Sequence, residues 1–191
     1  LHRVLLHNAP LASPQDVAAL LASYARDALA RIGSADLPAL TGLRAALESA
    51  LGLTFDNERG ERFFRSTLVQ TLFYGVFSAW VLWARRRRGA SGQAAAFAVR
   101  ESAEAYRADA DRFDWHTAVW HLRVPMIRAL FEQLATPARL GPLGLEEVLD
   151  WAAAALNRVD AQAFFAAFDE GHAVQYFYEP FLQAFDPELR R

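Results

Sequence analysis

The most apolar stretch of the chain spans residues 63–84, and no charged residue occurs between Arg65 and Arg85. On a helix, which turns by 100° per residue, the few polar side chains of this stretch fall on one narrow stripe. They are Thr67, Gln70, Thr71, Tyr74 and Ser78. A helix that is apolar on nearly every other face is buried, either in a protein core or in a bilayer. We interpret it as a central core helix of about residues 63–88.

A membrane span is the alternative interpretation of this helix. The charge-free run just reaches the lower limit of about 17 residues for crossing a bilayer, and the arginines that follow suit a cytoplasmic anchor. Against a span stand Gln70 at mid-depth, two Thr, two Ser and a Gly. Amphipathic helices elsewhere in the chain also need an apolar surface to cover, so we favour the core helix.

Apolar residues at helical spacing predict two helices before the central one. The first is capped by Ser13 and ends at Gly33, and the second runs from about Pro38 to Leu51, with Gly52 as its stop. The segment 54–60 is expected to be a polar turn. After the central helix, Gly89-Ala90-Ser91-Gly92 predicts a flexible break.

Helical patterns also fill the second half of the chain. Asp114 and Asp160 are expected to cap helices, Pro125 to interrupt one, and residues 136–144 to form a linker. The expected helices are 93–113, 115–124, 126–135, 145–159, 160–168 and an aromatic segment within 172–191. No run of alternating residues predicts a strand. The predicted fold is therefore all-α, an irregular multi-helix bundle around the central helix.

Length and composition favour one globular domain. The chain has 191 residues, of which 53% are apolar and 22% charged. We divide it into an N-terminal helical pair (1–60), central helices (61–135) and C-terminal helices (145–191). The chain starts at Leu1 with no signal-peptide pattern, and we expect it to be a piece of a longer cytoplasmic protein.

The residue types exclude several chemistries. There is no cysteine, which removes disulfides and thiolate chemistry and fits a reducing cytosol. All 20 basic residues are arginine, so the chain has no phosphate-binding or Schiff-base lysine. The net charge is −2, so the overall charge does not attract nucleic acid, and any such contact would need a local basic patch.

No catalytic or metal site is predicted. His116 and His121 are five residues apart, about 140° around a helix, which is poor for a shared metal. The carboxylates of the Arg-containing segment 101–111 (Glu101, Glu104, Asp109 and Asp111) are expected on a solvated face. The sequence lacks G-x-S-x-G, H-E-x-x-H and a strand followed by G-x-G-x-x-G. We therefore expect no cofactor and no activity in these residues.

Two features could bind a partner. Arg85, Arg86, Arg87 and Arg88 are either a solvated helix end, where the dipole favours cations, or contacts for DNA phosphates. Arg59, Arg62 and Arg65 would extend such a patch only if the fold brought them near. The second feature is a set of C-terminal aromatics, either core or an interdomain docking surface. They are Tyr176, Phe177, Tyr178, Phe181 and Phe185.

Helical geometry divides these aromatics between two faces. Tyr178, Phe181 and Phe185 are expected to share one face, while Tyr176 lies about 160° from Tyr178. One set is expected to pack on this chain and the other to remain for a partner. An exposed apolar surface could also pair with a second copy in solution or in a crystal.

Three stretches together resemble one protein family. TLVQTLFYGVFSAWVLWAR (67–85) resembles the AQTLxYGLFxAR helix of single-polypeptide restriction–modification enzymes of the type IIG or ISP-like kind. TAVWHLRVPMIRALFEQLA (117–135) resembles their VPxLRxLFExL segment, and AVQYFYEPFLQAFDPELRR (173–191) their VxHFYExFLxAYDPxLR run. The order matches, Tyr74-Gly75 matches the family's Tyr-Gly pair, and Phe185 replaces its usual Tyr.

The resemblance implies a helical coupler, or spacer, between upstream nuclease or motor parts and an adenine-specific DNA methyltransferase domain of the same parent chain. S-adenosylmethionine is the cofactor expected for that parent enzyme, and DNA its substrate. The methyltransferase's glycine-rich loop and Asn/Asp-Pro-Pro-Tyr/Phe motif have no counterpart here. The second functional hypothesis is an independent helical DNA-binding module that uses the Arg patches, and the third is a membrane-anchored helical protein.

Overall fold

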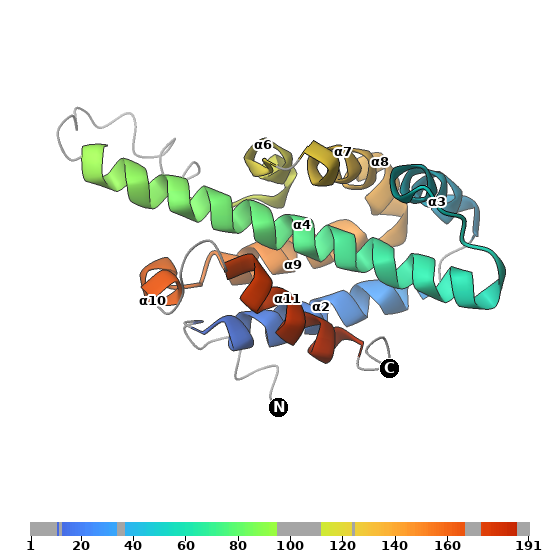
Figure 1. The fold of residues 1–191 in the computed structure, drawn as a ribbon, viewed down its shortest axis with the longest axis horizontal. Coiled ribbons are helices and arrows are strands. Elements are labelled where there is room, and N and C mark those ends of the chain that lie inside the picture. Colours follow the sequence, from blue (N-terminus) through green and yellow to red (C-terminus); the bar gives the residue numbers. More distant parts are fainter. Residues whose placement is uncertain are drawn as a thin grey trace.

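Helices make up most of the chain that the structure, a computed structural model, describes (Figure 1). The described residues are 11, 13–33, 37–94, 112–123, 125–166 and 173–186. The longer helices are α2 (Pro14–Gly33), α3 (Leu37–Leu51), α4 (Asn57–Ala94), α7 (Pro125–Leu134), α9 (Leu145–Leu156) and α11 (Ala173–Phe185). The shorter ones are η2 (Trp115–Thr117), α6 (Ala118–His121), α8 (Pro137–Leu140), η3 (Gly141–Leu143) and α10 (Ala161–Ala166). Within these ranges the only β-type pairing is an isolated bridge between Leu11 and Val159, so the predicted all-α fold is confirmed.

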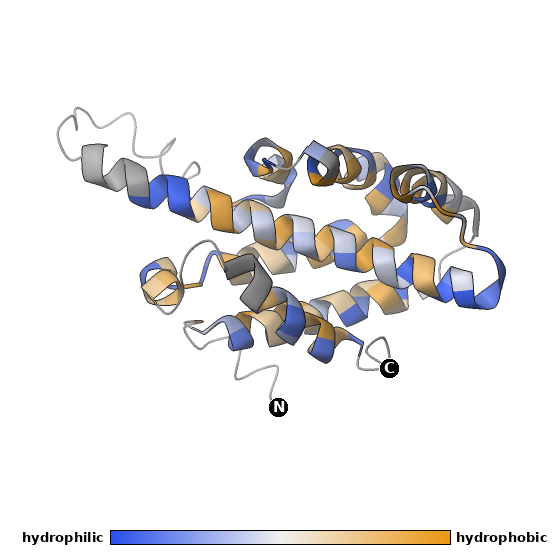
Figure 2. Cartoon of the chain, viewed as in Figure 1, coloured by the Kyte–Doolittle hydropathy of each residue, from blue (hydrophilic) through white to orange (hydrophobic). Residues whose placement is uncertain are grey.

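The predicted central helix is α4, which is 38 residues long. Figure 1 shows it running across the molecule, with α3, α6, α7 and α8 on one side and α2, α10 and α11 on the other. It contacts α2, α3, α6, α7, α9 and α11. Figure 2 shows that its middle turns are the most hydrophobic, while the described turns at its two ends are hydrophilic.

The apolar part of α4 is covered by the protein's own helices. Residues Asn57–Arg88 contain a stretch long and apolar enough to cross a membrane, and 67% of that stretch is buried inside the protein. Ser78 is buried with the apolar residues, whereas the other polar residues of the predicted stripe are only partly buried. This burial supports the core interpretation of α4 over the membrane one.

Several predicted helix ends are confirmed by their hydrogen bonds. The Asp16 amide donates to Ser13 Oγ over 3.1 Å at the start of α2. The His116 amide donates to Asp114 Oδ1 over 3.0 Å at the start of η2. The amides of residues 162 and 163 donate to Asp160 Oδ1 at the start of α10. Gly52, with a φ of 66°, follows the end of α3, as a left-handed glycine stop does.

Two predicted irregular segments are wrong, and a third is wrong in part. The backbone of Gly89–Gly92 belongs to α4, which continues to Ala94. Each residue added to a helix that is already formed gains one backbone hydrogen bond. This gain offsets the helix-propensity cost of about 1 kcal/mol for each glycine. Residues 137–143 form two short helical turns whose Leu140 and Leu143 are buried. The segment 54–60 is only partly a turn, because α4 begins at Asn57. Of the helix expected over 93–113, residues 95–111 lie outside the described residues.

An aromatic core joins α4 to the C-terminal helices. The Phe77 ring stacks on the Phe177 ring with centroids 3.7 Å apart. Trp80 meets Phe164 edge-on at 5.3 Å and stacks with Phe165 at 5.8 Å. All five side chains are buried. Large rings packed in this way contribute strongly to stability. The stable packing of the C-terminal helices therefore depends on their contacts with α4.

Gly75 lets α7 approach α4 closely. A Cβ atom at this position would lie only 2.5 Å from Cδ2 of Phe131, a buried ring of α7. A side chain of any size at position 75 would therefore push the ring away. The Tyr-Gly pair at 74–75 thus has a packing reason in this chain.

Candidate functional site

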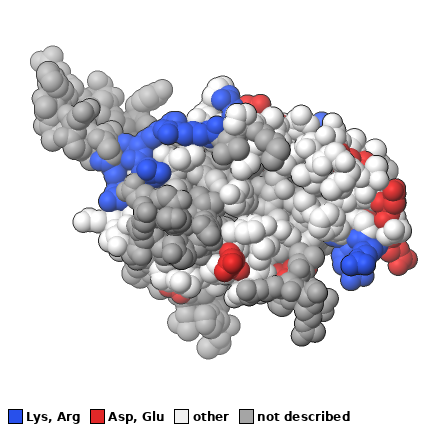
Figure 3. Space-filling view, in the orientation of Figure 1, with Lys and Arg blue, Asp and Glu red and all other residues white. Residues whose placement is uncertain are grey.

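The four arginines Arg85–Arg88 lie in α4 beyond its apolar part, and all four side chains are exposed. Figure 3 shows basic side chains gathered over this part of the molecule. Successive residues on a helix point about 100° apart, so the four guanidinium groups cannot all face one ligand. The structure directs Arg87 and Arg88 toward one hollow and Arg86 toward His121.

Aromatic rings position two of these guanidinium groups. The Arg87 guanidinium carbon lies 4.9 Å from the centroid of the Trp83 ring, and that of Arg88 lies 5.4 Å from the centroid of the Phe165 ring. These are cation–π distances. The contacts limit the motion of both heads, so their charges are held beside the surface between α4 and the residues that follow α9.

A hollow of about 540 Å³ lies at this surface, and we call it the basic hollow. Arg112, just before η2, and Arg158, just after α9, line it together with Arg87 and Arg88. No aspartate or glutamate is among the described residues that line it. The others are Trp80, Trp83, Ala84, Ala154, Leu156, Asn157, Val159 and Ala161. The basic hollow therefore combines four guanidinium groups with an apolar wall.

A neighbouring hollow of about 690 Å³ shares Trp83 and Arg112 with the basic hollow, and it also contains Asp114 and Asp150. Asp150 Oδ1 accepts a hydrogen bond from Trp115 Nε1 over 2.7 Å. Asp114 caps η2 and lies 2.8 Å from His116 Nδ1. Both carboxylates thus have structural partners within their own part of the fold.

His121 lies between this neighbouring hollow and Arg86. Burial lowers the pKa of His121, and the positive charge of Arg86 lowers it further. The lowered pKa favours the neutral ring at neutral pH. Its Nδ1 lies 3.4 Å from Arg86 Nη1, and a neutral ring nitrogen can accept a hydrogen bond from a guanidinium.

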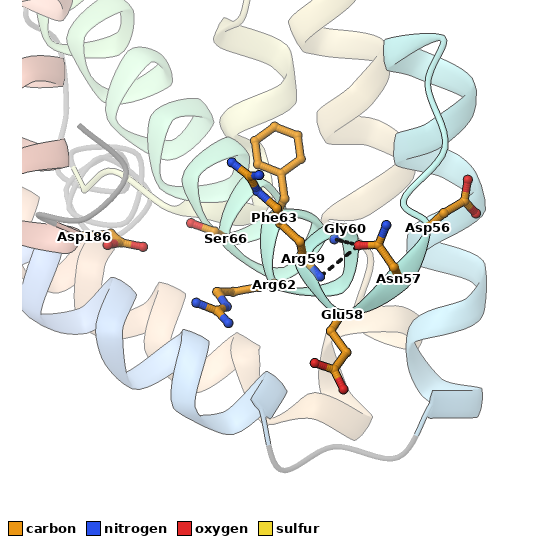
Figure 4. Close-up of a pocket in the computed structure, with 9 residues that line it drawn as sticks. All are labelled: Asp56, Asn57, Glu58, Arg59, Gly60, Arg62, Phe63, Ser66 and Asp186. Atoms are coloured by element: carbon orange, nitrogen blue, oxygen red, sulfur yellow. Dashed lines mark hydrogen bonds between the residues drawn. The ribbon is translucent and has the colours of Figure 1, made fainter. Parts of the chain in front are cut away.

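A separate hollow of about 820 Å³ lies at the start of α4 (Figure 4). Asn57 caps this helix, because its Oδ1 accepts hydrogen bonds from the amides of Arg59 and Gly60. Arg59 and Arg62 line the hollow, and Asp186 reaches it from the end of α11. The exposed ring of Phe63 forms part of the wall.

Arg59, Arg62 and Arg65 do not extend the Arg85–Arg88 patch. Arg62 and Arg85 lie about 35 Å apart along one helix at 1.5 Å per residue. Arg65 has another role, since it donates to the Ile32 carbonyl over 2.7 Å and pairs with Glu61 over 2.8 Å. These three arginines were expected to join the Arg85–Arg88 patch only if the fold brought them near, and the fold keeps the two groups apart.

The C-terminal aromatics divide between core and surface, but not along the predicted line. Phe177, Phe181 and Phe185 are buried in a stacked row, with centroids 5.3 and 5.6 Å apart. They cannot supply an exposed docking surface, so that prediction is wrong for these three. Tyr178 is 38% exposed and meets Tyr74 edge-on at 5.6 Å. The Tyr176 side chain lies outside the described residues.

The packed face of this helix differs in part from the predicted one. Phe181 and Phe185 are buried together with Phe177, at a spacing of four, whereas Tyr178, which helix geometry places about 20° from Phe185, is partly exposed. Residues four apart on a helix point only about 40° apart, and this spacing allows three parallel rings to stack. Tyr178 lies at the edge of the row, where the Tyr74 ring covers part of it.

No group of three His, Cys, Asp or Glu residues that could hold a metal ion occurs in the part of the chain that the structure describes. His116 pairs with Asp114, and His121 with Arg86. His2, His7 and His172 lie outside the described residues. So do the carboxylates for which a solvated face was expected, namely Glu101, Glu104, Asp109 and Asp111.

Comparison with known proteins adds no relative to this picture. The chain matches no protein-family model, no curated protein and no solved structure. The functional interpretation therefore depends on the residues themselves and on the contacts that the fold creates between them.

Sequence reasoning missed Arg112, Arg158 and Trp83 as members of a site. Arg112 and Arg158 each precede a capping aspartate by two residues, Asp114 and Asp160. That position predicts a surface location at a helix start, but it does not indicate that the two would meet. Only the packing of α9 against η2 and α4 brings them to one hollow.

Proposed function

We propose that this chain is a non-catalytic helical coupling domain of a cytoplasmic DNA adenine methyltransferase or restriction–modification enzyme. It would link upstream parts of the parent chain to the methyltransferase domain. The resemblance of three separate stretches to that family motivates the proposal. The observation that carries it is that these stretches, distant in sequence, pack on one another around α4.

The contacts between the three stretches involve the residues that match the family pattern. Tyr74, in the first stretch, meets Tyr178 in the third, and Gly75 accommodates the ring of Phe131 from the second. Phe77 of the first stacks on Phe177 of the third. If the family pattern is kept because its residues pack together, its matching residues are expected to contact one another across the three stretches, as they do here. The match therefore agrees with a structural role for these positions.

The shape of the fold suits a spacer. At 1.5 Å per residue, the 38 residues of α4 span about 57 Å. Helices from both halves of the chain pack along it. A long helix held at many points moves as a rigid body, so a displacement at one end reaches the other. Such an element can fix the distance between two catalytic parts and transmit motion between them.

The chemistry of the proposed parent would reside outside these residues. The sequence contains no cysteine, no lysine and no glycine-rich loop after a strand, and it lacks the Asn/Asp-Pro-Pro-Tyr/Phe motif. We therefore expect no S-adenosylmethionine site within residues 1–191. In this proposal the cofactor and the target adenine belong to the methyltransferase domain, and this chain holds that domain in position.

Methylation of host DNA tests the proposal. The full-length gene that encodes this sequence is expressed in a methylation-deficient bacterial strain, and N6-methyladenine is mapped by single-molecule sequencing. We expect methyladenine at one sequence motif from the full-length gene and none from residues 1–191 alone. A full-length product that accumulates in soluble form but leaves the DNA unmethylated would contradict the proposal.

A further inference from the structure

The first half of α4 presents an uncharged strip of side chains to solvent. We call it the α4 strip, and its members are Phe63, Thr67, Gln70, Thr71 and Tyr74. On a helix that turns by 100° per residue, these five positions lie within about 100° of one another. None of the described helices crosses in front of α4 in Figure 1, and Figure 3 shows mainly uncharged side chains over its middle turns. Phe63 is 46% exposed and the other four are half-buried.

Aromatic rings lie at both ends of the α4 strip. Phe63 begins it, and Tyr74 ends it about 16 Å further along the helix. Tyr178 of α11 meets the Tyr74 ring edge-on at 5.6 Å and is itself partly exposed. Between the two ends, Thr67 and Gln70 supply uncharged hydrogen-bonding groups. Aromatic side chains are enriched where one protein covers another, and charged side chains are depleted there. The strip therefore has the composition of an interface.

Charges of opposite sign flank the two ends of the α4 strip. Arg59 precedes Phe63 by about one helical turn, and Figure 4 shows both side chains on the same side of α4, with Glu58 and Arg62 pointing elsewhere. Glu179 lies on α11, directly after the exposed tyrosine at the other end. Arg59 and Glu179 are both exposed, and neither forms an ion pair within the described part of the chain. The strip therefore has a positive end and a negative end.

We infer that two copies of this chain pair through the α4 strip. A strip with opposite charges at its ends complements itself, because a two-fold axis reverses its direction in the second copy. With the two α4 helices antiparallel and the axis near Thr67 and Gln70, Phe63 of each copy lies over the tyrosines of the other. Arg59 then reaches Glu179 of the second copy, and the same contact forms again at the opposite end. Complementary charges fix the register of such an interface.

This inference does not depend on the proposed coupling function, since it concerns residues 1–191 alone. Both use the exposed edge at Tyr178, so a second copy and a following domain of the same chain would compete for that edge. A pair is therefore expected where the domain is absent and the chain is concentrated. Dilution separates the two copies and leaves the Tyr178 edge open.

The test is sedimentation equilibrium of residues 1–191 at low salt. Chain concentrations of about 5–500 µM cover the affinities expected of a small interface. The test variants are the charge reversals Arg59→Glu and Glu179→Arg, measured singly and as an equimolar mixture, and Phe63→Ser. The matched control is Arg123→Glu, which makes the same charge change as Arg59→Glu at an exposed position beyond the end of α6. Circular dichroism verifies the fold of each variant.

We expect the wild-type chain to form dimers as its concentration rises. Each charge reversal alone should weaken dimerisation by about tenfold, because it places like charges together at both ends of a symmetric interface. The equimolar mixture of the two reversed chains should recover the wild-type affinity, because both ends of a mixed pair again join opposite charges. Phe63→Ser should also weaken the dimer, and Arg123→Glu should leave it unchanged.

Three outcomes would overturn the inference. The first is a wild-type chain that stays monomeric up to about 500 µM. The second is an equal loss of affinity in Arg59→Glu and in the control Arg123→Glu, which would indicate an effect of overall charge only. The third is a mixture of the two reversed chains that pairs no better than either chain alone, which would show that Arg59 and Glu179 do not meet across a two-fold axis.

Discussion

Replacing Phe177 with alanine is expected to destabilise the protein by about 3–5 kcal/mol. Phe177 is fully buried, stacks on Phe77 at 3.7 Å and lies 5.3 Å from Phe181. Removing its ring would lose the apolar transfer free energy and leave a cavity between α4 and α11. The measurement is the free energy of unfolding from a urea titration, followed by circular dichroism.

The control for this substitution lies two residues away. Glu179 is exposed on the same helix, and Glu179→Ala should change stability by less than about 0.5 kcal/mol. Comparable small losses in both variants would show that the Phe177 ring is not part of a packed core. The Phe77–Phe177 contact between the first and third family-like stretches would then contribute little to stability.

Replacing Gly75 with leucine is expected to cost about 1–3 kcal/mol by overpacking. The first added carbon would already lie 2.5 Å from the Phe131 ring, and the rest of the side chain would need further space. Either the ring leaves its position or α7 moves away from α4. Urea unfolding measures the cost on the same scale as for Phe177→Ala.

Two further variants separate the close contact from the general effect of leucine. A Cβ atom added to Gly42, on α3, would meet no neighbouring atom within 4 Å, so Gly42→Leu should be neutral or slightly stabilising, since leucine favours helices. In the Phe131→Ala background, Gly75→Leu should cost less than in the wild type, because the ring is gone. Additive costs in the double variant would contradict the close approach of α7.

The sequence predicted the helices well where a local signal marks their ends. Ser13, Asp114 and Asp160 are caps whose hydrogen bonds depend on their own neighbours, and Gly52 is a stop with a positive φ. The extension of α4 through Gly89 and Gly92 was not predictable in this way. Two glycines usually indicate a break, but the continuity of a long helix outweighed them.

The C-terminal helix illustrates a different limit. Its aromatic pattern predicted that one set of rings would pack and another would stay exposed. In α11 the rings of Phe177, Phe181 and Phe185 are packed and Tyr178 is partly exposed, while the Tyr176 side chain lies outside the described residues. The sequence could not identify the packed set, because faces offset by 100° are both aromatic. The packing of α11 on α2 and α4 decided it. Pro180 also lies inside α11, where local preference alone would end the helix.

The candidate site was predictable only in part. The run Arg85–Arg88 is visible in the sequence, but its division between a hollow and His121 depends on the direction of each side chain on α4. Arg112 and Arg158 are 46 positions apart, and no local pattern links them. A site made by several segments follows from tertiary packing, which a single sequence does not specify residue by residue.

The proposed coupling role predicts that the methyltransferase domain covers the exposed edge of α11 at Tyr178, and amide hydrogen exchange over Ala173–Phe185 tests this most directly. Exchange is compared between residues 1–191 alone and the full-length protein, with α9 (Leu145–Leu156) as an internal reference. We predict stronger protection around Tyr178 in the full-length protein and unchanged protection in α9, because a docked domain suppresses local opening of the helix it covers. Equal protection of α11 in the two proteins would contradict the coupling role.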